Sequence, residues 1–144
     1  MPTSYFLACL FCLVTMQEGQ GRPDDPAQPQ LSKVCVSSNG RQLIAGESGR
    51  QLRVWGVNYD HDASGRLIED YWHENWSAVE EDFAEIKQLG ANTVRVHLQL
   101  GKFMNSTQQP NDQNVAQLQK LVKLAERLKL YLDITGLGCY HKSD

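Results

Sequence analysis

The chain has 144 residues, of which 22% are charged and 41% hydrophobic, and its formal net charge at pH 7 is −3. This balance is typical of a globular protein, and the lack of a basic patch disfavours nucleic acid and anionic membranes as partners. The length suits one domain and excludes a complete (β/α)8 barrel, which needs about 250 residues.

The N-terminal segment is predicted to be a signal peptide over residues 1–21. Residues 5–16 form an apolar run that is too short to span a bilayer and suits a signal-peptide core. Gly19 and Gly21 supply small residues at the −3 and −1 positions of a cleavage site after Gly21. We therefore expect a secreted or periplasmic protein. The alternatives are a buried N-terminal helix and a wrongly chosen start, because the first four residues carry no Lys or Arg.

Residues 22–32 are predicted to be a linker, because this stretch holds three of the five prolines and has no apolar face to pack. The folded domain is expected over residues 33–144. After cleavage it keeps Cys35 and Cys139, which form either a disulfide or two separate thiols. Neither their spacing nor a neighbouring His indicates a zinc site.

The first folded element is predicted to be a β-hairpin. Residues 33–36 and 41–44 are short β-rich runs on either side of Asn39-Gly40, a pair that tolerates the positive φ of hairpin turns. A second turn is expected at residues 47–50. Residues 52–59 then have the few polar residues of a buried strand.

A helix is predicted to begin at Ser77 and to end at Gly90. Ser77 and Glu80 fit a capping box, and Gly90 stands where a left-handed C-cap residue belongs. The apolar residues between them recur at helical spacing. They are Val79, Phe83, Ile86 and Leu89.

The remaining elements alternate between strand and helix. Residues 93–98 are predicted to form a strand, 114–129 a second helix and 130–135 a third strand. Strands that alternate with helices indicate right-handed βαβ units and a parallel sheet.

Polar residues alternate with apolar ones in the strand at residues 93–98. Its apolar positions are expected to face the covering helices, so Arg95, His97 and Gln99 face the other way. In a doubly wound sheet that second face would also be covered, and an unpaired Arg there would be costly. In a barrel it lines the active site.

The third strand repeats this pattern with Asp133 and Thr135. Two strands with a polar face favour a barrel over a doubly wound sheet. The alternative is that Arg95 and Asp133 form a structural ion pair.

Several stretches together resemble glycoside hydrolase family 5, the cellulase and mannanase family of clan A. Residues 53–59 resemble its first barrel strand, 82–97 its first helix and second strand, and 130–136 its third strand. The preceding hairpin is similar to the element that closes the barrel floor. The likeness spans roughly residues 33–141.

The resemblance implies an α/β fold, namely the N-terminal half of a (β/α)8 TIM barrel with a preceding β-hairpin. It implies retaining hydrolysis of β-glycosidic bonds by two Glu residues about 5–5.5 Å apart, at the ends of the fourth and seventh strands. Both would lie beyond residue 144. We therefore expect a fragment of a secreted glycosidase that acts on a polysaccharide and is inactive by itself. The alternatives are a non-catalytic carbohydrate-binding half-barrel, either monomeric or dimeric, and an unrelated hydrolase.

The resemblance also suggests individual site residues. Arg95 matches the second-strand Arg that keeps the nucleophile ionised, which makes it a supporting residue. No metal or organic cofactor is implied. The family often carries a His where this chain has Thr135, and His97 serves either sugar contact or packing. The residues expected to contact substrate are Asn58, Tyr59, Asp60, Trp72, His97, Tyr140 and His141.

The loop after the first strand contains aromatic and acidic residues. Tyr71 and Trp72 have faces suited to stacking on sugars, whereas Trp76 stands at a helix start and is expected to clamp the loop. The acids of this loop are expected to lie on a solvated surface. They are Glu69, Asp70 and Glu74.

Overall fold

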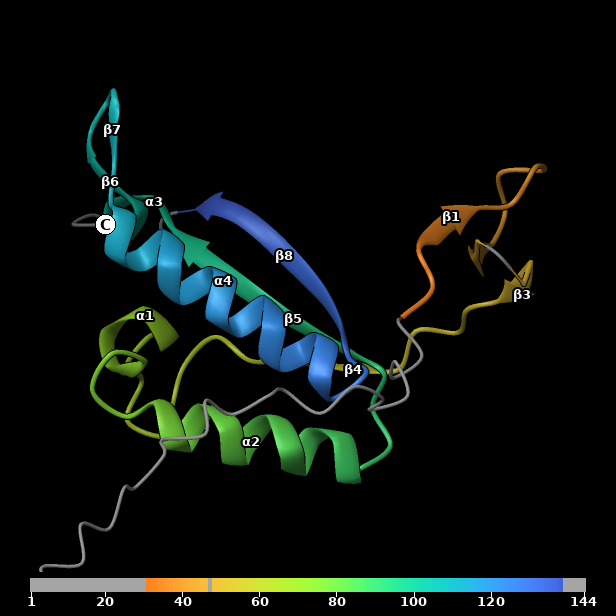
Figure 1. The fold of residues 1–144 in the computed structure, drawn as a ribbon, viewed down its shortest axis with the longest axis horizontal. Helices are drawn as coiled ribbons and strands as arrows, with labels where there is room; N and C mark the ends of the chain where they lie inside the picture. The colour runs from red at the N-terminus through yellow and green to blue at the C-terminus, as the bar shows by residue number, and fades with distance from the viewer. Residues whose placement is uncertain (1–30, 47, 139–144) are drawn as a thin grey trace, which may run out of the picture.

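A computed structural model of the chain describes residues 31–46 and 48–138. The predicted signal peptide, most of the linker, Cys139, Tyr140 and His141 lie outside the described residues. The strands form three separate sheets, of which two are antiparallel and one is parallel (Figure 1).

The N-terminal sheet contains three antiparallel strands, β1 (Val34–Val36), β2 (Leu43–Ala45) and β3 (Arg50–Gln51). The predicted hairpin is confirmed, since β1 pairs with β2. Its turn uses Gly40 at a φ of 70°, and the Asn39 side chain accepts the backbone N–H of Arg41 at 3.0 Å. The turn expected at residues 47–50 is found at residues 48 and 49, between β2 and β3, with Gly49 at a φ of 62°.

The parallel sheet contains β4 (Gly56–Asn58), β5 (Thr93–Gln99) and β8 (Tyr131–Gly138), in the order β4-β5-β8. Parallel pairing on both sides of β5 agrees with the predicted alternation of strands and helices. Gly56 permits the close approach of β4 to β5, because a Cβ atom there would lie 2.6 Å from the carbonyl oxygen of Thr93.

Helices α2 (Trp76–Gln88) and α4 (Asp112–Arg127) lie along the sheet (Figure 1). Their apolar stripes form one core with the inward side chains of β5. These core residues include Val79, Phe83 and Ile86 of α2, Leu121, Leu124 and Ala125 of α4, and Val94, Val96 and Leu98 of β5. In the described part of the chain, no helix combines the length and apolarity needed to cross a membrane.

The ends of α2 test the predicted caps. Gly90 follows the helix at a φ of 87°, as expected of a C-terminal cap. The capping box predicted at Ser77 is wrong, because the helix already begins at Trp76 with Asn75 as its N-cap. The Ser77 hydroxyl donates to the Asn75 side chain at 3.1 Å.

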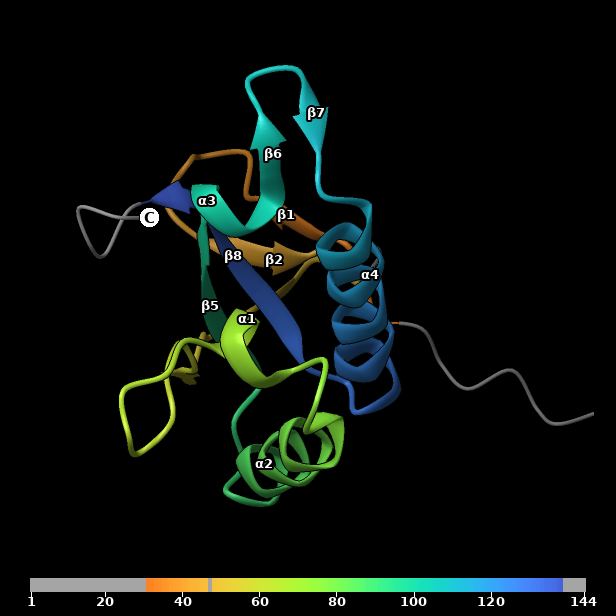
Figure 2. The same cartoon turned by 90° about the vertical axis from the view of Figure 1, so that its left-hand side faces the viewer.

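Besides β3, four short elements were not expected. They are α1 (Ile68–Tyr71), α3 (Leu100–Phe103), β6 (Met104–Ser106) and β7 (Gln109–Pro110). Strands β6 and β7 pair into an antiparallel ribbon that projects beyond α3 (Figure 2).

The predicted N-terminal half of a (β/α)8 TIM barrel is wrong. The described residues form three separate small sheets, and the parallel one contains three strands. Closing a barrel needs a stagger repeated over about eight strands. In addition, the strand expected over residues 52–59 is shortened to β4. The Asn92 side chain binds the Trp55 N–H and the Arg53 carbonyl oxygen, at 3.0 and 2.8 Å, in place of ladder bonds.

Candidate functional site

The outward side of the parallel sheet carries a row of polar side chains, which we call the polar sheet face. It consists of Asn58 on β4, Arg95 and His97 on β5, and Asp133 and Thr135 on β8. Asn58, Arg95 and Asp133 are paired in register across the three strands, and His97 is paired with Thr135. Side chains at paired positions share one face. The structure therefore brings three predicted site residues, Asn58, Arg95 and His97, together.

Three members of the polar sheet face are exposed, namely Asn58, Arg95 and Asp133, whereas His97 and Thr135 are half-buried. Among the ion pairs of the described residues, none joins Arg95 to Asp133. The alternative of a structural ion pair is therefore not supported. A guanidinium and a carboxylate instead stand side by side in reach of solvent.

The hydroxyl of Thr135 joins β8 to β5. It lies 3.1 Å from the carbonyl oxygen of Val96, to which it donates, and 2.9 Å from Nδ1 of His97. The sequence analysis treated Thr135 as a departure from the family pattern and missed this contact. The strand register, which sequence periodicity does not supply, is the signal that reveals it.

Tyr59 and Asp60 follow β4 and are half-buried. The Tyr59 hydroxyl donates to Asp82 of α2 at 2.5 Å and accepts the hydroxyl proton of Tyr71 at 3.1 Å. Burial raises the pKa of Tyr59 well above its usual range. Tyr59 therefore connects the end of β4 to α2, and its hydroxyl is engaged within the protein.

Trp72 is fully buried, contrary to the expectation that it offers a stacking face to sugar. Its indole N–H donates to Oδ1 of Asn114 at 3.1 Å, and its ring packs edge-on against Phe103. Trp72 therefore belongs to the core of this structure. Trp76 is half-buried beneath the Lys120 ammonium group, which lies 4.1 Å from its ring centre.

Asn114 is a buried polar residue that the sequence analysis did not single out. Its side chain accepts hydrogen bonds from Trp72 Nε1 and His73 Nε2, at 3.1 and 2.7 Å, and donates to the carbonyl oxygen of Lys102 at 2.6 Å. It joins the loop after β4, the α3 region and the start of α4. No local sequence pattern predicts these contacts, because the partner groups lie on distant parts of the chain.

Glu69 was expected on a solvated surface and is instead buried, with 5% of its surface exposed. Its Oε1 atom accepts the backbone N–H of Gln99 at the end of β5, at 2.8 Å. Its Oε2 atom is buried without a hydrogen bond to the described residues. Burial raises the pKa of this carboxyl group. The neighbouring Asp70 is exposed and forms an ion pair with Lys102 at 2.5 Å.

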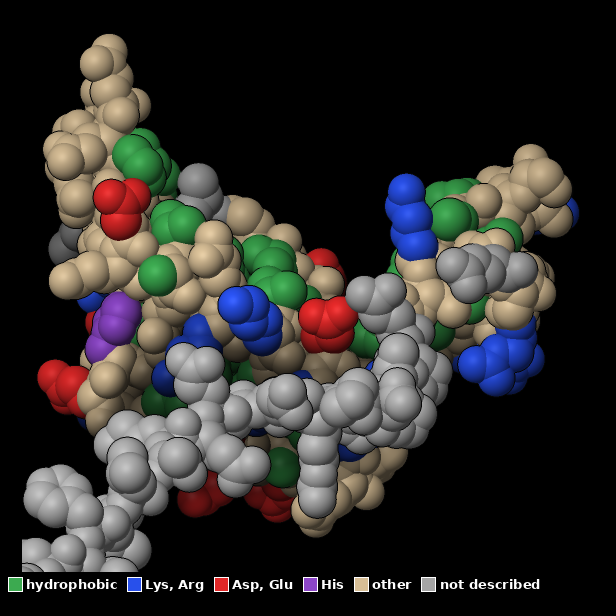
Figure 3. All heavy atoms as spheres, in the orientation of Figure 1, with side chains coloured by type: hydrophobic (Ala, Val, Ile, Leu, Met, Phe, Trp, Pro, Cys, Tyr) green, Lys and Arg blue, Asp and Glu red, His purple; other side chains and the backbone are tan. Residues whose placement is uncertain are grey.

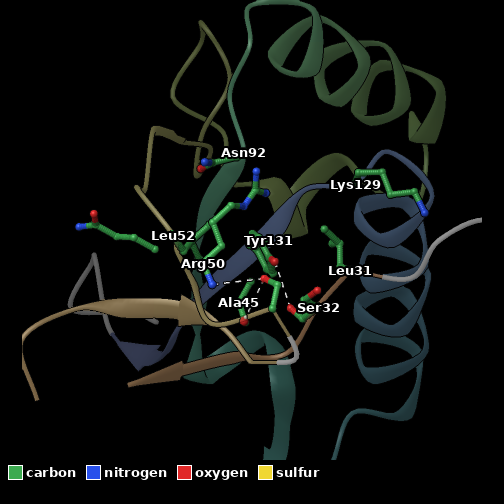
Figure 4. Close-up of a pocket in the computed structure, with 10 residues that line it drawn as sticks. Leu31, Ser32, Ala45, Arg50, Leu52, Asn92, Lys129 and Tyr131 are labelled. Atoms are coloured by element: carbon green, nitrogen blue, oxygen red, sulfur yellow. Dashed lines mark hydrogen bonds between the residues drawn. The ribbon is translucent and has the colours of Figure 1, made fainter. Parts of the chain in front are cut away.

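A cavity of about 310 Å³ lies between the N-terminal sheet and the parallel sheet, near the notch that separates the β1–β3 lobe in Figure 3. Figure 4 shows the Arg50 guanidinium directed toward Asn92, whereas Lys129 extends away from Arg50. The Tyr131 hydroxyl donates to the carbonyl oxygen of Ser32 at 3.0 Å. Asn92 and Tyr131 stand at the amino ends of β5 and β8, so the cavity is separate from the polar sheet face.

Within residues 31–46 and 48–138, no cluster of three His, Cys, Asp or Glu side chains is arranged to hold a metal ion. Comparison of the chain with protein-family models, curated proteins and solved structures finds no match. The functional argument therefore depends on the residues of this chain.

Proposed function

We propose that this chain binds carbohydrate through the polar sheet face, as part of a secreted glycoside hydrolase that acts on a polysaccharide. The observation that carries the proposal is the exposed, in-register row of Asn58, Arg95 and Asp133 on a parallel sheet. Parallel sheets usually have both faces covered by apolar packing. An exposed row of hydrogen-bonding groups on such a sheet suits a polar ligand.

The chemistry of the row suits sugar hydroxyl groups, which both donate and accept hydrogen bonds. Arg95 is a pure donor, Asp133 when ionised is a pure acceptor, and Asn58 offers both functions. Neighbouring strands lie about 4.8 Å apart, so the three groups form a ladder along which an extended saccharide is able to bind. Hydrogen bonds to charged groups are stronger than those between neutral groups. Arg95 and Asp133 are therefore expected to contribute most to affinity.

Cleavage by the retaining mechanism requires two carboxyl groups about 5–5.5 Å apart. The polar sheet face as defined contains a single carboxylate, Asp133. We therefore expect these residues to bind sugar without cleaving it. In the glycosidase resemblance, Arg95 stands beside a nucleophile that another part of the enzyme supplies.

Titration of the chain with soluble β-linked gluco- and manno-oligosaccharides, followed by calorimetry and NMR shift mapping, tests this proposal. We expect shift changes centred on the polar sheet face and no release of shorter sugars. Arg95→Ala and Asp133→Asn should each weaken binding about 10- to 100-fold, because a hydrogen bond to a charged group contributes about 1.5–3 kcal/mol. The matched control is Arg41→Ala, an exposed Arg in the N-terminal hairpin turn. Absence of binding, or equal binding by Arg95→Ala and wild type, would refute the proposal.

We also propose that residues 1–21 direct export. Fusing these residues to a reporter that is active only outside the cytoplasm, with a fusion lacking residues 5–16 as the control, tests this. Reporter activity should require the apolar run. Equal activity of the two fusions would contradict an export role.

A further inference from the structure

Two segments of the chain carry the tripeptide Asn-X-Ser/Thr, with a residue other than Pro at the middle position. They are residues 75–77 (Asn-Trp-Ser) and residues 105–107 (Asn-Ser-Thr). In exported proteins this tripeptide is the acceptor motif for N-linked glycans, which need an Asn at the surface. Because the motif is short and arises by chance, its place in the fold decides whether it is able to carry a glycan.

The second motif lies on the ribbon formed by β6 and β7, which projects beyond α3 (Figure 2). Asn105 stands between Met104 and Ser106, where the pairing of the two strands is irregular. Every residue from 105 to 110 is exposed, and all of them lie outside the hydrophobic core. A bulky hydrophilic group linked to Asn105 would therefore extend into solvent without displacing a core side chain.

The side-chain amide of Asn105 is able to keep its observed hydrogen bond when a glycan is attached. Its Nδ2 atom donates to the carbonyl oxygen of Pro110 at 3.2 Å, and the amide group of Asn carries two N–H donors. A glycosidic bond to Nδ2 replaces one of these hydrogens and leaves the other for Pro110. The linkage is therefore compatible with the contact that joins the two strands of the ribbon.

The first motif has a less suitable position. Asn75 is the N-cap residue of α2, and its Oδ1 atom accepts the hydroxyl proton of Ser77 at 3.1 Å. The middle residue, Trp76, is half-buried beneath the ammonium group of Lys120. Two of the three motif residues thus belong to the first turn of a helix that packs against the sheet. The structure therefore favours Asn105 as the acceptor.

We propose that Asn105 is an acceptor for an N-linked glycan. The donor is an oligosaccharide joined through its anomeric carbon to a lipid pyrophosphate. Nδ2 forms a bond to that carbon and loses one proton, while the bond from the carbon to the pyrophosphate oxygen breaks and its electron pair leaves with the lipid pyrophosphate. The inference rests on the export proposed for residues 1–21, because the transfer takes place outside the cytoplasm, and does not depend on sugar binding by the polar sheet face.

Expression of the full chain in cultured animal cells, whose secretory pathway attaches N-linked glycans, tests the proposal. We expect the secreted chain to migrate more slowly in gels than the same chain treated with a peptide N-glycosidase. Treatment in ¹⁸O water converts the Asn that carried the glycan into ¹⁸O-labelled Asp, and mass spectrometry should find this label at position 105.

Four variants locate the glycan. Asn105→Gln keeps a side-chain amide but is not an acceptor, so the gel shift should be lost. Asn75→Gln is the matched control in the other motif and should keep the shift. Thr107→Ala retains Asn105 and removes the hydroxyl group that the motif requires, so the shift should again be lost, whereas Thr107→Ser should keep it. Secretion of each variant into the medium shows that it has passed through the glycosylating compartment.

A second form of the chain, with a proven signal peptide placed ahead of Met1, separates this inference from the export proposal. Glycosylation of this form but not of the wild type would support the acceptor role of Asn105 and contradict export by residues 1–21. Secretion of this form without a glycan would overturn the acceptor role. A gel shift that is unchanged in Asn105→Gln, or abolished in Asn75→Gln, would overturn it as well.

Discussion

Replacing Asn114 with Ala should cost about 2–4 kcal/mol of unfolding free energy. The substitution removes the partner of the Trp72 indole N–H, which is fully buried, and of the half-buried Lys102 carbonyl group. A buried polar group left without its hydrogen bond costs about 1–3 kcal/mol. The third partner, His73, is exposed and exchanges its bond for one to water, so it adds little. The total unfolding free energy of a small domain is about 5–15 kcal/mol, so the loss is substantial.

Urea denaturation followed by tryptophan fluorescence measures this effect directly. The matched control is Asn111→Ala, which removes the N-cap of α4 from the same segment and should cost about 1 kcal/mol. A double-mutant cycle with Trp72→Phe isolates the indole contact, and the coupling energy should be about 1 kcal/mol. A loss for Asn114→Ala no larger than that for Asn111→Ala would refute the reasoning, as would a coupling energy of zero.

Three further changes test other contacts. Burial raises the pKa of Glu69, so the contribution of this carboxyl group to the unfolding free energy is complete at low pH and is lost as the pH rises through the folded-state pKa. Glu69→Gln keeps an acceptor and should remove this loss, which makes it about 1–3 kcal/mol more stable than wild type at alkaline pH. A pH-independent difference between the urea midpoints of the two proteins would contradict this. Gly56→Ala should accelerate amide hydrogen exchange in β4 and β5, because the added Cβ would lie 2.6 Å from the carbonyl oxygen of Thr93. Gly136→Ala is the control, because a Cβ atom there has no neighbour within 4 Å. Equal exchange rates in the two variants would be evidence against the steric argument. Tyr59→Phe should cost about 1–2 kcal/mol in urea, because it removes the hydroxyl bonded to Asp82, and an unchanged midpoint would show that this bond contributes nothing.

Sequence periodicity predicted the elements whose packing is regular. The alternation of Val94, Val96 and Leu98 with polar residues located β5 and its buried side, and the apolar stripe of α4 located that helix within two residues at each end. The parallel pairing also followed from the alternation of strands with helices. These features depend on repeated local patterns.

Features that depend on contacts between distant residues were not predicted. Trp72 was expected at the surface and is buried, because Asn114, 42 positions away, accepts its indole N–H. Glu69 was expected in solvent and is buried against the end of β5. The half-barrel was inferred from resemblance and from the polar face of β5, but neither specifies how many strands join one sheet. Alternation placed Arg95 and His97 on one face, whereas Gln99, which was expected beside them, is fully buried. The register of β4 against β5 adds Asn58 to that face.

The long connections between the parallel strands have a kinetic consequence. The N-terminal hairpin closes a short loop, whereas Trp55 and Asn92, which meet beside β4 and β5, are 37 positions apart. Loop closure costs more entropy for longer loops, and non-local strand pairing is correspondingly slow. Because the polar sheet face takes residues from all three strands, it comes into existence only when this late pairing is complete. A ligand that binds there would act on the final folding equilibrium and stabilise the native chain by mass action.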